Sequence, residues 1–240
     1  MTVDLTIGEI VAKDFRKAEV FKKFGIDFCC GGKKTIHETC SKKGINEGDV
    51  FTALEAVDNQ TTDTSLDFNI MPMAELVDYI ITKHHAYVKE SSIILTEFLS
   101  KVARVHGGNH PELIMINDLF LEAKAELDAH MRKEEMILFP YIKNLSEALS
   151  LGATGFSASF GSVLNPIQMM EYEHESVGDI FKEINKLSAN YNPPEGACAT
   201  YRVSFLKLQE FENDLFTHIH LENNILFPRA VEAENQLTKL

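Results

Sequence analysis

Apolar residues recur at helical spacing along four long segments in the last two thirds of the chain. The segments lie at about 73–104, 111–143, 163–189 and 196–232, and stretches rich in Gly, Pro and Ser separate them. No alternating strand pattern accompanies them. Four helices of this length with such connections predict an all-α fold, an up-down-up-down four-helix bundle.

The N-terminal part of the chain has a different pattern, with shorter helical pieces. Thr6 and Glu9 form a capping box at the start of the first piece. We therefore expect a small helical domain over residues 1–58. A polar run with nothing to bury predicts a linker over 59–67, and the bundle domain then occupies 68–240.

An internal repeat connects the second and fourth long segments. Residues 130–140 (HMRKEEMILFP) align without gaps with residues 218–228 (HIHLENNILFP). One further histidine precedes each of them, His85 by 45 residues and His174 by 44. The repeating unit is therefore a helical hairpin.

Steps of three and four residues place polar side chains among the apolar ones that line each predicted helix. These side chains are His85, His130, Glu134, His174, His218 and Glu222. A lone buried histidine is usually satisfied by a hydrogen bond. Four histidines together with two carboxylates need a counter-charge, because burying an unpaired carboxylate costs several kcal/mol.

Two metal ions supply that charge, with the two glutamates as bridging ligands. Imidazole and carboxylate ligands favour iron, and less specifically manganese or zinc. A thiolate site is excluded here, since no cysteine falls on these helix faces. The residues thus predict a dinuclear site, most specifically a non-haem di-iron site, inside the bundle.

Other polar residues are candidates for supporting roles. Glu126 lies one turn before His130 on the same face and is a candidate acid or base, and Glu173 is a weaker candidate of the same kind. The alternative for both is an ordinary surface carboxylate. The spacing predicts that His84 and His220 face away from the site and lie on the surface.

Cys29 and Cys30 precede a helix that we expect to begin near Lys33. The helix N-terminus, Lys33 and Lys34 should lower a thiol pKa, and a thiolate there could bind iron, NO or a partner thiol. The alternative is a pair of small buried hydrophobic residues. We interpret Cys40 as a core or surface residue, and the same holds for the fourth cysteine.

The charge of the chain limits its partners. A formal net charge of −13, from 36 acidic and 23 basic residues, opposes nucleic-acid binding. No apolar run is long enough for a membrane span, and the N-terminus lacks the pattern of a secretory signal. We therefore expect a cytoplasmic protein with free thiols and no membrane contact, with a homodimer as one candidate assembly.

The ligand pattern, with His, His-x-x-x-Glu, His and a second carboxylate, resembles the haemerythrin-like di-iron bundle. Oxygen-carrying haemerythrins have five histidines and a last motif His-x-x-x-x-Asp, whereas this chain has four and ends with His218-x-x-x-Glu222. Two octahedral ions have about twelve positions. Four imidazoles, two bridging carboxylates and an oxo bridge leave roughly one open position on each iron, which favours reactivity or metal release over carriage.

The segment Gly25-Ile-Asp-Phe-Cys29-Cys30-Gly-Gly-Lys33 resembles the small domain that precedes the bundle in the Repair of Iron Centres family, the YtfE, DnrN and ScdA group. This resemblance covers nearly the whole chain. It implies a stress protein with a μ-oxo di-iron centre that restores iron–sulfur clusters damaged by nitric oxide or oxidants, by donating iron or processing NO. Its partners would be damaged iron–sulfur proteins, with NO or O₂ as small ligands.

Two other functions stay open from the sequence. One is a non-catalytic sensor or carrier of O₂ or NO, which would have no use for Cys29 and Cys30. The other is an NO-detoxifying reductase, for which cluster repair is an indirect result. Whether the protein is an enzyme is not decided by these patterns.

Overall fold

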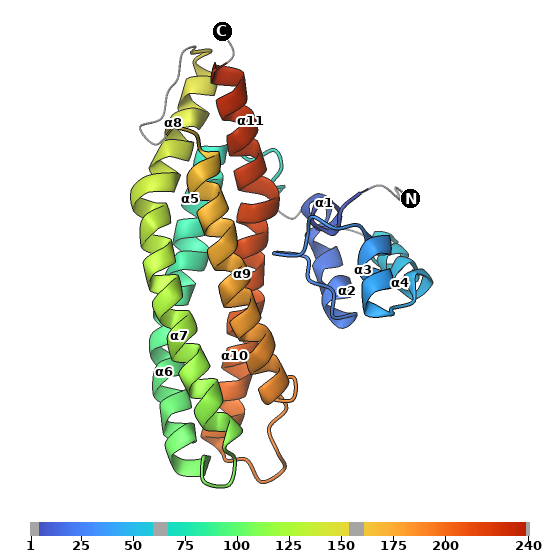
Figure 1. Ribbon diagram of the computed structural model, residues 1–240, viewed down its shortest axis with the longest axis vertical. Coiled ribbons are helices and arrows are strands. Elements are labelled where there is room, and N and C mark those ends of the chain that lie inside the picture. Colours follow the sequence, from blue (N-terminus) through green and yellow to red (C-terminus); the bar gives the residue numbers. More distant parts are fainter. Residues whose placement is uncertain (1–4, 60–66, 154–160, 239–240) are drawn as a thin grey trace.

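The four long segments form four helical rods that alternate in direction, running down, up, down and up in Figure 1. The computed structural model describes residues 5–59, 67–153 and 161–238. In chain order the rods are α5 (Met73–Ile80), η2 (Ile81–His85) and α6 (Ala86–His106); α7 (Glu112–Lys133), η3 (Glu134–Leu138) and α8 (Phe139–Ser150); α9 (Leu164–Leu187); and α10 (Ala199–Leu221), η4 (Glu222–Leu226) and α11 (Phe227–Thr238). The predicted all-α bundle is confirmed.

Three rods contain a five-residue π-helical turn, namely η2, η3 and η4. Pro140 and Pro228 each follow such a turn by two residues. Proline lacks an N–H group and crowds the carbonyl four residues earlier, so a wider turn lets the helix continue through it. The repeated Phe-Pro pair thus explains η3 and η4, whereas η2 contains no proline.

The second and fourth rods extend farther than their periodicity predicts, to Ser150 and Thr238. In α11 the inward face carries small alanines and the buried carboxylate of Glu234, which interrupt the apolar pattern. Glu234 accepts hydrogen bonds from the Tyr141 hydroxyl at 2.6 Å and from the backbone N–H of Val163 at 2.9 Å. It therefore joins the end of the second rod to the start of α9.

Two apolar clusters fill the interior of the bundle, and the six predicted metal ligands lie between them. One cluster includes Leu127, Val177 and Leu215 on one side of the ligands. The other includes Val77 and Ile225 on the opposite side. The polar layer is therefore closed off along the bundle axis by apolar side chains.

The N-terminal module, residues 5–59, consists of short helices: α1 (Ile7–Lys13), η1 (Phe15–Lys17), α2 (Ala18–Lys23), α3 (Ile36–Lys43) and α4 (Glu47–Asp58). The predicted capping box at Thr6 is present. Thr35 forms a second capping box at the start of α3. Most of the predicted linker, residues 60–66, lies outside the described residues.

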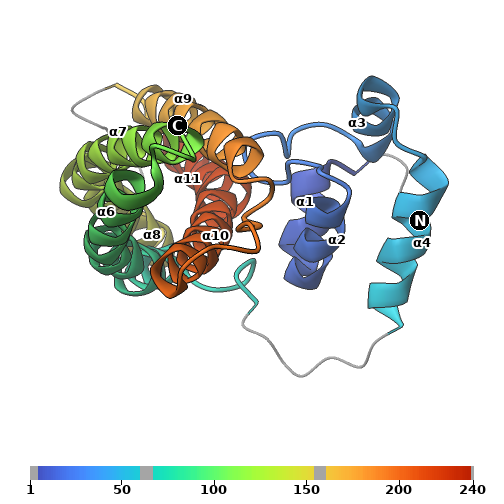
Figure 2. The same ribbon diagram turned by 90° about the horizontal axis from the view of Figure 1, so that it is seen from below.

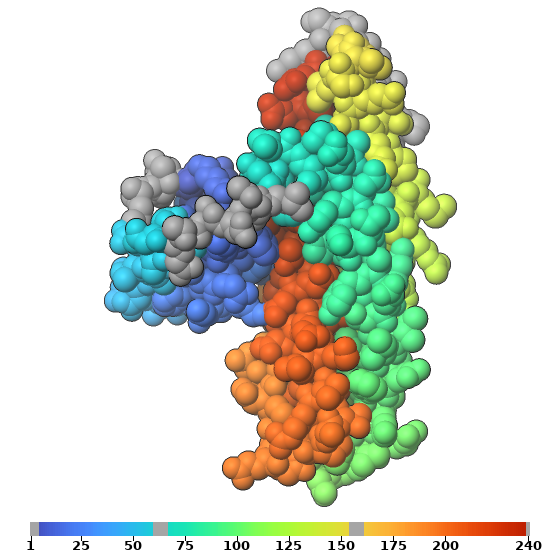
Figure 3. Space-filling view, turned by 180° about the vertical axis from the view of Figure 1, so that it is seen from behind, coloured from blue at the N-terminus to red at the C-terminus, as the bar shows by residue number. Residues whose placement is uncertain are grey.

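The module packs against the side of the bundle, beside α9 and the fourth rod (Figures 2 and 3). Its buried residues belong to the same apolar cluster as one half of the bundle interior. Asp27 pairs with Lys182 at 3.3 Å, and Lys33 pairs with Glu171 at 2.7 Å. In the described part of the chain, no helix is both long and apolar enough to cross a membrane.

Candidate metal centre

The bundle brings all six predicted ligand side chains into one layer, with each rod contributing. Two groups of four form, and each keeps its ligand atoms within 4.8 Å of one another. Both groups contain Glu134 and Glu222. The histidines are His85 and His218 in one group, and His130 and His174 in the other.

Each carboxylate directs its two oxygens to different groups. One oxygen of Glu134 faces a histidine of the first group and the other faces a histidine of the second, and Glu222 is arranged in the same way. The distances from Nε2 to the nearest of these oxygens are 3.4 Å for His85, 3.3 Å for His130, 3.1 Å for His174 and 2.9 Å for His218. This is the geometry of carboxylates that bridge two cations.

The imidazoles of each group direct their Nε2 atoms at each other. Nε2 of His85 lies 3.1 Å from Nε2 of His218, and Nε2 of His130 lies 2.9 Å from that of His174. Three of the rings face oxygen acceptors with Nδ1: His85 at Glu135 (2.8 Å), His130 at Glu173 (2.9 Å) and His174 at Asn223 (2.8 Å). Those Nδ1 atoms must donate, so the opposite Nε2 atoms present lone pairs to the site.

The buried carboxylates provide a test of whether a metal fits. Glu134 and Glu222 are both 0% exposed. Both oxygens of Glu134 and Oε2 of Glu222 have no hydrogen-bond partner among the described residues. A cation placed within each group would bind the facing Nε2 lone pairs and also the carboxylate oxygens that lack a hydrogen-bond partner. The residues therefore fit two metal ions.

The electrostatics point the same way. When no cation is bound, burial lowers the pKa of His85, yet the neighbouring carboxylates of Glu134 and Glu222 raise it to about 10. The pKa of His130 is likewise lowered by burial and raised by Glu134 to about 10 overall. Although burial raises the pKa of Glu222, His218 and its neighbours hold it well below its usual range. The field of the two carboxylates thus favours positive charge in this layer.

Glu173 hydrogen-bonds His130, so the structure places this candidate directly against a predicted ligand. Glu126 instead accepts a hydrogen bond from the Ser176 hydroxyl at 3.1 Å. Sequence reasoning missed two other supports, Glu135 and Asn223. The repeat contained a signal for them, because both directly follow the carboxylate of their motif.

The prediction that His84 faces away from the site is wrong. His84 is 5% exposed, its ring stacks on His218 with centroids 5.7 Å apart, and Nδ1 lies 3.0 Å from Oδ1 of Asp214. The π-helical turn η2 spans both His84 and His85. Its wider winding reduces the rotation per residue, so two successive histidines point inward.

The prediction for His220 is also wrong, for a different reason. Its side chain does leave the ligand face, but it is 0% exposed because the N-terminal module covers it. Its ring lies 5.9 Å from that of Phe15 and 5.8 Å from that of Phe28. The pattern of the bundle alone could not show where a second domain docks.

The two neighbouring cysteines lie in the loop between α2 and α3, with their sulfurs 3.8 Å apart. The helix after them begins at Ile36, not near Lys33. The expected lowering of the thiol pKa is wrong for Cys29. A hydrogen bond to Cys30, burial and the negative charge of Asp27 raise the pKa of Cys29 well above its usual range.

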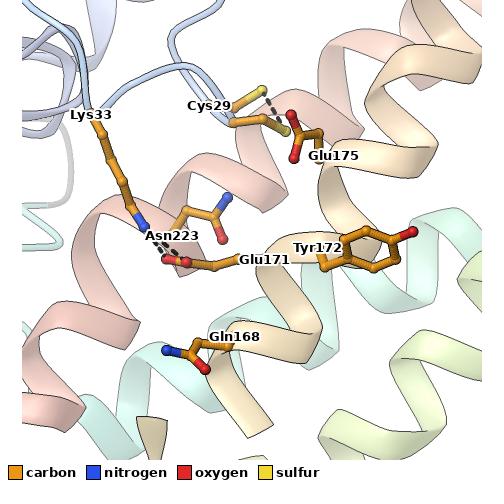
Figure 4. Close-up of a pocket in the computed structure, with 8 residues that line it drawn as sticks. Cys29, Lys33, Gln168, Glu171, Tyr172, Glu175 and Asn223 are labelled. Atoms are coloured by element: carbon orange, nitrogen blue, oxygen red, sulfur yellow. Dashed lines mark hydrogen bonds and ion pairs between the residues drawn. The ribbon is translucent and has the colours of Figure 1, made fainter. Parts of the chain in front are cut away.

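Cys30 lies against the metal layer itself, because its thiol donates to the backbone carbonyl of His174 at 3.4 Å. Both cysteines line a cavity of about 330 Å³ between the loop, α9 and η4 (Figure 4). Asn223, which supports His174, lines the same cavity. Thiols and the shell of the candidate ligands therefore meet in one cavity.

Comparison with known proteins agrees with this architecture. Residues 3–58 match the family model ScdA_N, described as a domain of unknown function, and residues 76–230 match the hemerythrin HHE cation binding domain. The iron-sulfur cluster repair protein YtfE of Pectobacterium carotovorum subsp. carotovorum (strain PC1) is 36% identical over 234 residues, covering 96% of this chain and 98% of that protein.

Two further relatives bear the same name. The YtfE protein of Yersinia pestis (strain Pestoides F) is 35% identical over 236 residues, 95% of this chain and 97% of the relative. That of Escherichia coli O157:H7 is 32% identical over 231 residues, 96% and 98% of the two chains. The chain belongs to the Repair of Iron Centres family. The buried layer of four histidines and two glutamates lies within the residues that match the hemerythrin cation binding domain.

Proposed function

We propose that the layer of four histidines and two glutamates holds an oxo-bridged pair of iron ions, and that the protein uses it to repair iron–sulfur clusters damaged by nitrosative or oxidative stress. The observation that carries the metal site is the arrangement of Glu134 and Glu222. Each carboxylate has one oxygen in each group of ligands, so each could hold both ions.

The number of donors favours reactivity over simple carriage. Each group offers two imidazole nitrogens and two carboxylate oxygens. An ion with about six positions keeps roughly two for ligands that are not protein, one of them shared in the bridge. NO or O₂ could bind at the remaining position of each ion, and an ion held by only four protein donors could also be released.

When bound, the irons would supply the redox chemistry. The chain orients their ligands and surrounds them with apolar side chains. Glu135, Glu173 and Asn223 hold three imidazoles in one orientation and one tautomer. The apolar clusters above and below keep bulk water out of the layer. Glu126, one turn from His130, is a proposed proton acceptor for the site.

The repair role rests on two supports besides the metal layer. Relatives that match nearly the full chain are named as iron-sulfur cluster repair proteins. In this chain Cys29 and Cys30 sit beside the metal layer, a position for which a non-catalytic sensor of O₂ or NO has no use. Damaged iron–sulfur proteins are thus the proposed partners and the cytoplasm the proposed compartment, with a homodimer as one possible assembly.

Metal analysis tests the site. The purified protein should contain about two iron ions per chain, and Glu222→Leu should lose the oxo-bridged absorption bands because one bridge is gone. The matched control is Glu232→Leu on the exposed face of α11. This variant should retain the iron content and the absorption bands. A protein that takes up one ion, or only zinc, would overturn the di-iron proposal.

A repair assay tests the function. The iron-loaded protein is incubated with an NO-damaged iron–sulfur enzyme, and recovery is compared with that given by Glu222→Leu and by the double change of Cys29 and Cys30 to Ser. Recovery should fall in both variants. If the enzyme recovers equally well with both variants and with the wild-type protein, the proposed repair function is wrong. Formation of N₂O from NO without any damaged enzyme would favour an NO-detoxifying reductase.

A further inference from the structure

The two repeated segments differ on the face that meets the N-terminal module. His220 and Asn224 of the second segment occupy the positions of Arg132 and Met136 in the first. Met136 is 77% exposed, whereas His220 is 0% exposed beneath the module. The second segment therefore carries a polar pair where its counterpart carries ordinary surface residues.

Asn224 connects this pair to the cysteine loop. Its Nδ2 lies 3.2 Å from the carbonyl oxygen of Cys29, 3.4 Å from that of Phe28 and 3.1 Å from Nδ1 of His220. An amide nitrogen only donates, so Nδ1 of His220 accepts and the ring is neutral.

The module leaves space for the same amide. A Cβ added at Gly8 would lie 2.2 Å from Oδ1 of Asn224, and one added at Gly32 would lie 2.8 Å from it. The backbone N–H of Gly8 donates to the carbonyl of Gly32 at 2.8 Å, which holds the two glycines side by side. Two residues without side chains thus form the socket that receives Asn224.

Three successive residues of η4 connect this socket to the candidate metal layer. Glu222 provides two ligand oxygens, Asn223 supports His174, and Asn224 holds the loop of Cys29. The same loop brings the thiol of Cys30 to the carbonyl of His174. A shift of Asn224 would therefore move the thiols relative to the layer without removing any of its ligands.

We propose that Asn224, supported by His220, is a positioning residue that holds the Cys29-Cys30 loop against the metal layer, and that the second repeat is specialised for this purpose. The proposal rests on the proposed function, because it assumes that the loop takes part in repair. It assigns to Asn224 no contact with the irons or with a substrate.

The test is Asn224→Met, which copies the first repeat, with Met136→Asn as the matched control. Asn224→Met should keep its iron content and absorption spectrum, and Cys30 should react with iodoacetamide about tenfold faster, as expected for the loss of one or two buried hydrogen bonds. The repair rate should fall toward that of the variant with both cysteines changed to Ser. Met136→Asn should match the wild-type protein in all three measurements.

Combining Asn224→Met with the double cysteine change separates positioning from a general structural role. If Asn224 acts through the thiols, the triple variant repairs no more slowly than the double cysteine variant. Unchanged alkylation in Asn224→Met, faster alkylation with wild-type repair, or a further loss of repair in the triple variant would each overturn the proposal. A wild-type protein without any repair activity would instead overturn the proposed function, and the alkylation rates would still decide how the loop is held.

Gly8→Ala provides a second route if Asn224→Met loses iron or unfolds. This change lies in the module, displaces the Asn224 amide through the added Cβ and leaves the bundle sequence intact. It should give the same faster alkylation and slower repair at wild-type iron content. Wild-type behaviour of Gly8→Ala in both measurements would overturn the role of the socket.

Discussion

Oδ1 of Asn223 lies 2.8 Å from Nδ1 of His174, and in the first hairpin Glu135 approaches His85 at the same distance. The two contacts occupy equivalent positions of the internal repeat. One hairpin thus orients its first histidine with a carboxylate and the other with an amide. Glu173 supplies the carboxylate to the second group through His130, so each pair of imidazoles has one charged acceptor.

Glu135→Ala should weaken iron binding, because the imidazole of His85 loses the acceptor that fixes its tautomer and ring orientation. Removal of such a partner typically costs roughly 10-fold to 100-fold in metal affinity. Iron retained during dialysis against a chelator measures the effect. Met136→Ala is the matched control, since the neighbouring side chain is exposed, and equal retention by the two variants would contradict the assigned support.

The helices and the six ligand residues could be predicted because they follow one rule. A residue on the inward face recurs every three or four positions, and a histidine or glutamate there stands out against apolar neighbours. The supports were harder to predict. Asn223 lies one residue off that face, and only the approach of α9 turns its amide into a partner of His174.

Two histidines show which information the periodicity lacks. The inward position of His84 depends on the π-helical winding of η2, which a fixed step of 100° per residue does not describe. The burial of His220 depends on contacts with Phe15 and Phe28, which are about 190 to 205 residues distant along the chain. The pKa of the Cys29 thiol is raised by the hydrogen bond to Cys30, by burial and by the charge of Asp27, and the sequence pattern does not describe that burial.

The buried carboxyl of Glu212 should make the protein less stable at neutral pH. Burial raises its pKa above the usual value, with the Tyr191 hydroxyl and Lys22 acting in the opposite direction. A carboxyl with a raised pKa in the folded state binds its proton more tightly there, so stability is greatest below the pKa of the unfolded chain, about 4.3, and falls as pH rises through the folded value.

Glu212→Gln should remove this dependence, because the amide stays neutral at every pH. The variant is therefore expected to gain stability relative to the wild-type protein as pH rises from about 4 to 7, as measured by urea unfolding of the metal-free protein. A difference that stays constant over this range would show that Glu212 has an ordinary pKa. Glu210→Gln, at an exposed position two residues away in α10, is the matched control and should keep the pH dependence of the wild-type protein.

Cys29 should react with iodoacetamide much more slowly than Cys198. Alkylation requires an accessible thiolate, and Cys29 is 4% exposed with a raised pKa, whereas Cys198 is exposed. A time course followed by peptide mass spectrometry at pH 8 should show labelling of Cys198 at least about tenfold faster. In urea, Cys29 and Cys198 should react at similar rates. A difference in rate that persists in urea would show that the folded structure does not cause it.

Glu234→Ala should destabilise the bundle, since it removes the carboxylate that accepts hydrogen bonds from the Tyr141 hydroxyl and, in a buried place, from the backbone N–H of Val163. Loss of a buried acceptor costs about 1–3 kcal/mol for each group left unsatisfied. Urea unfolding of the metal-free protein measures the change, and Glu232→Ala, an exposed neighbour on α11, should stay within about 0.5 kcal/mol of the wild-type value.

Because Glu234 joins the second rod to the start of α9, Glu234→Ala should also expose the backbone amides at the N-terminal end of α9 to hydrogen exchange. Equal protection in the two variants would show that Glu234 does not hold that end of the helix.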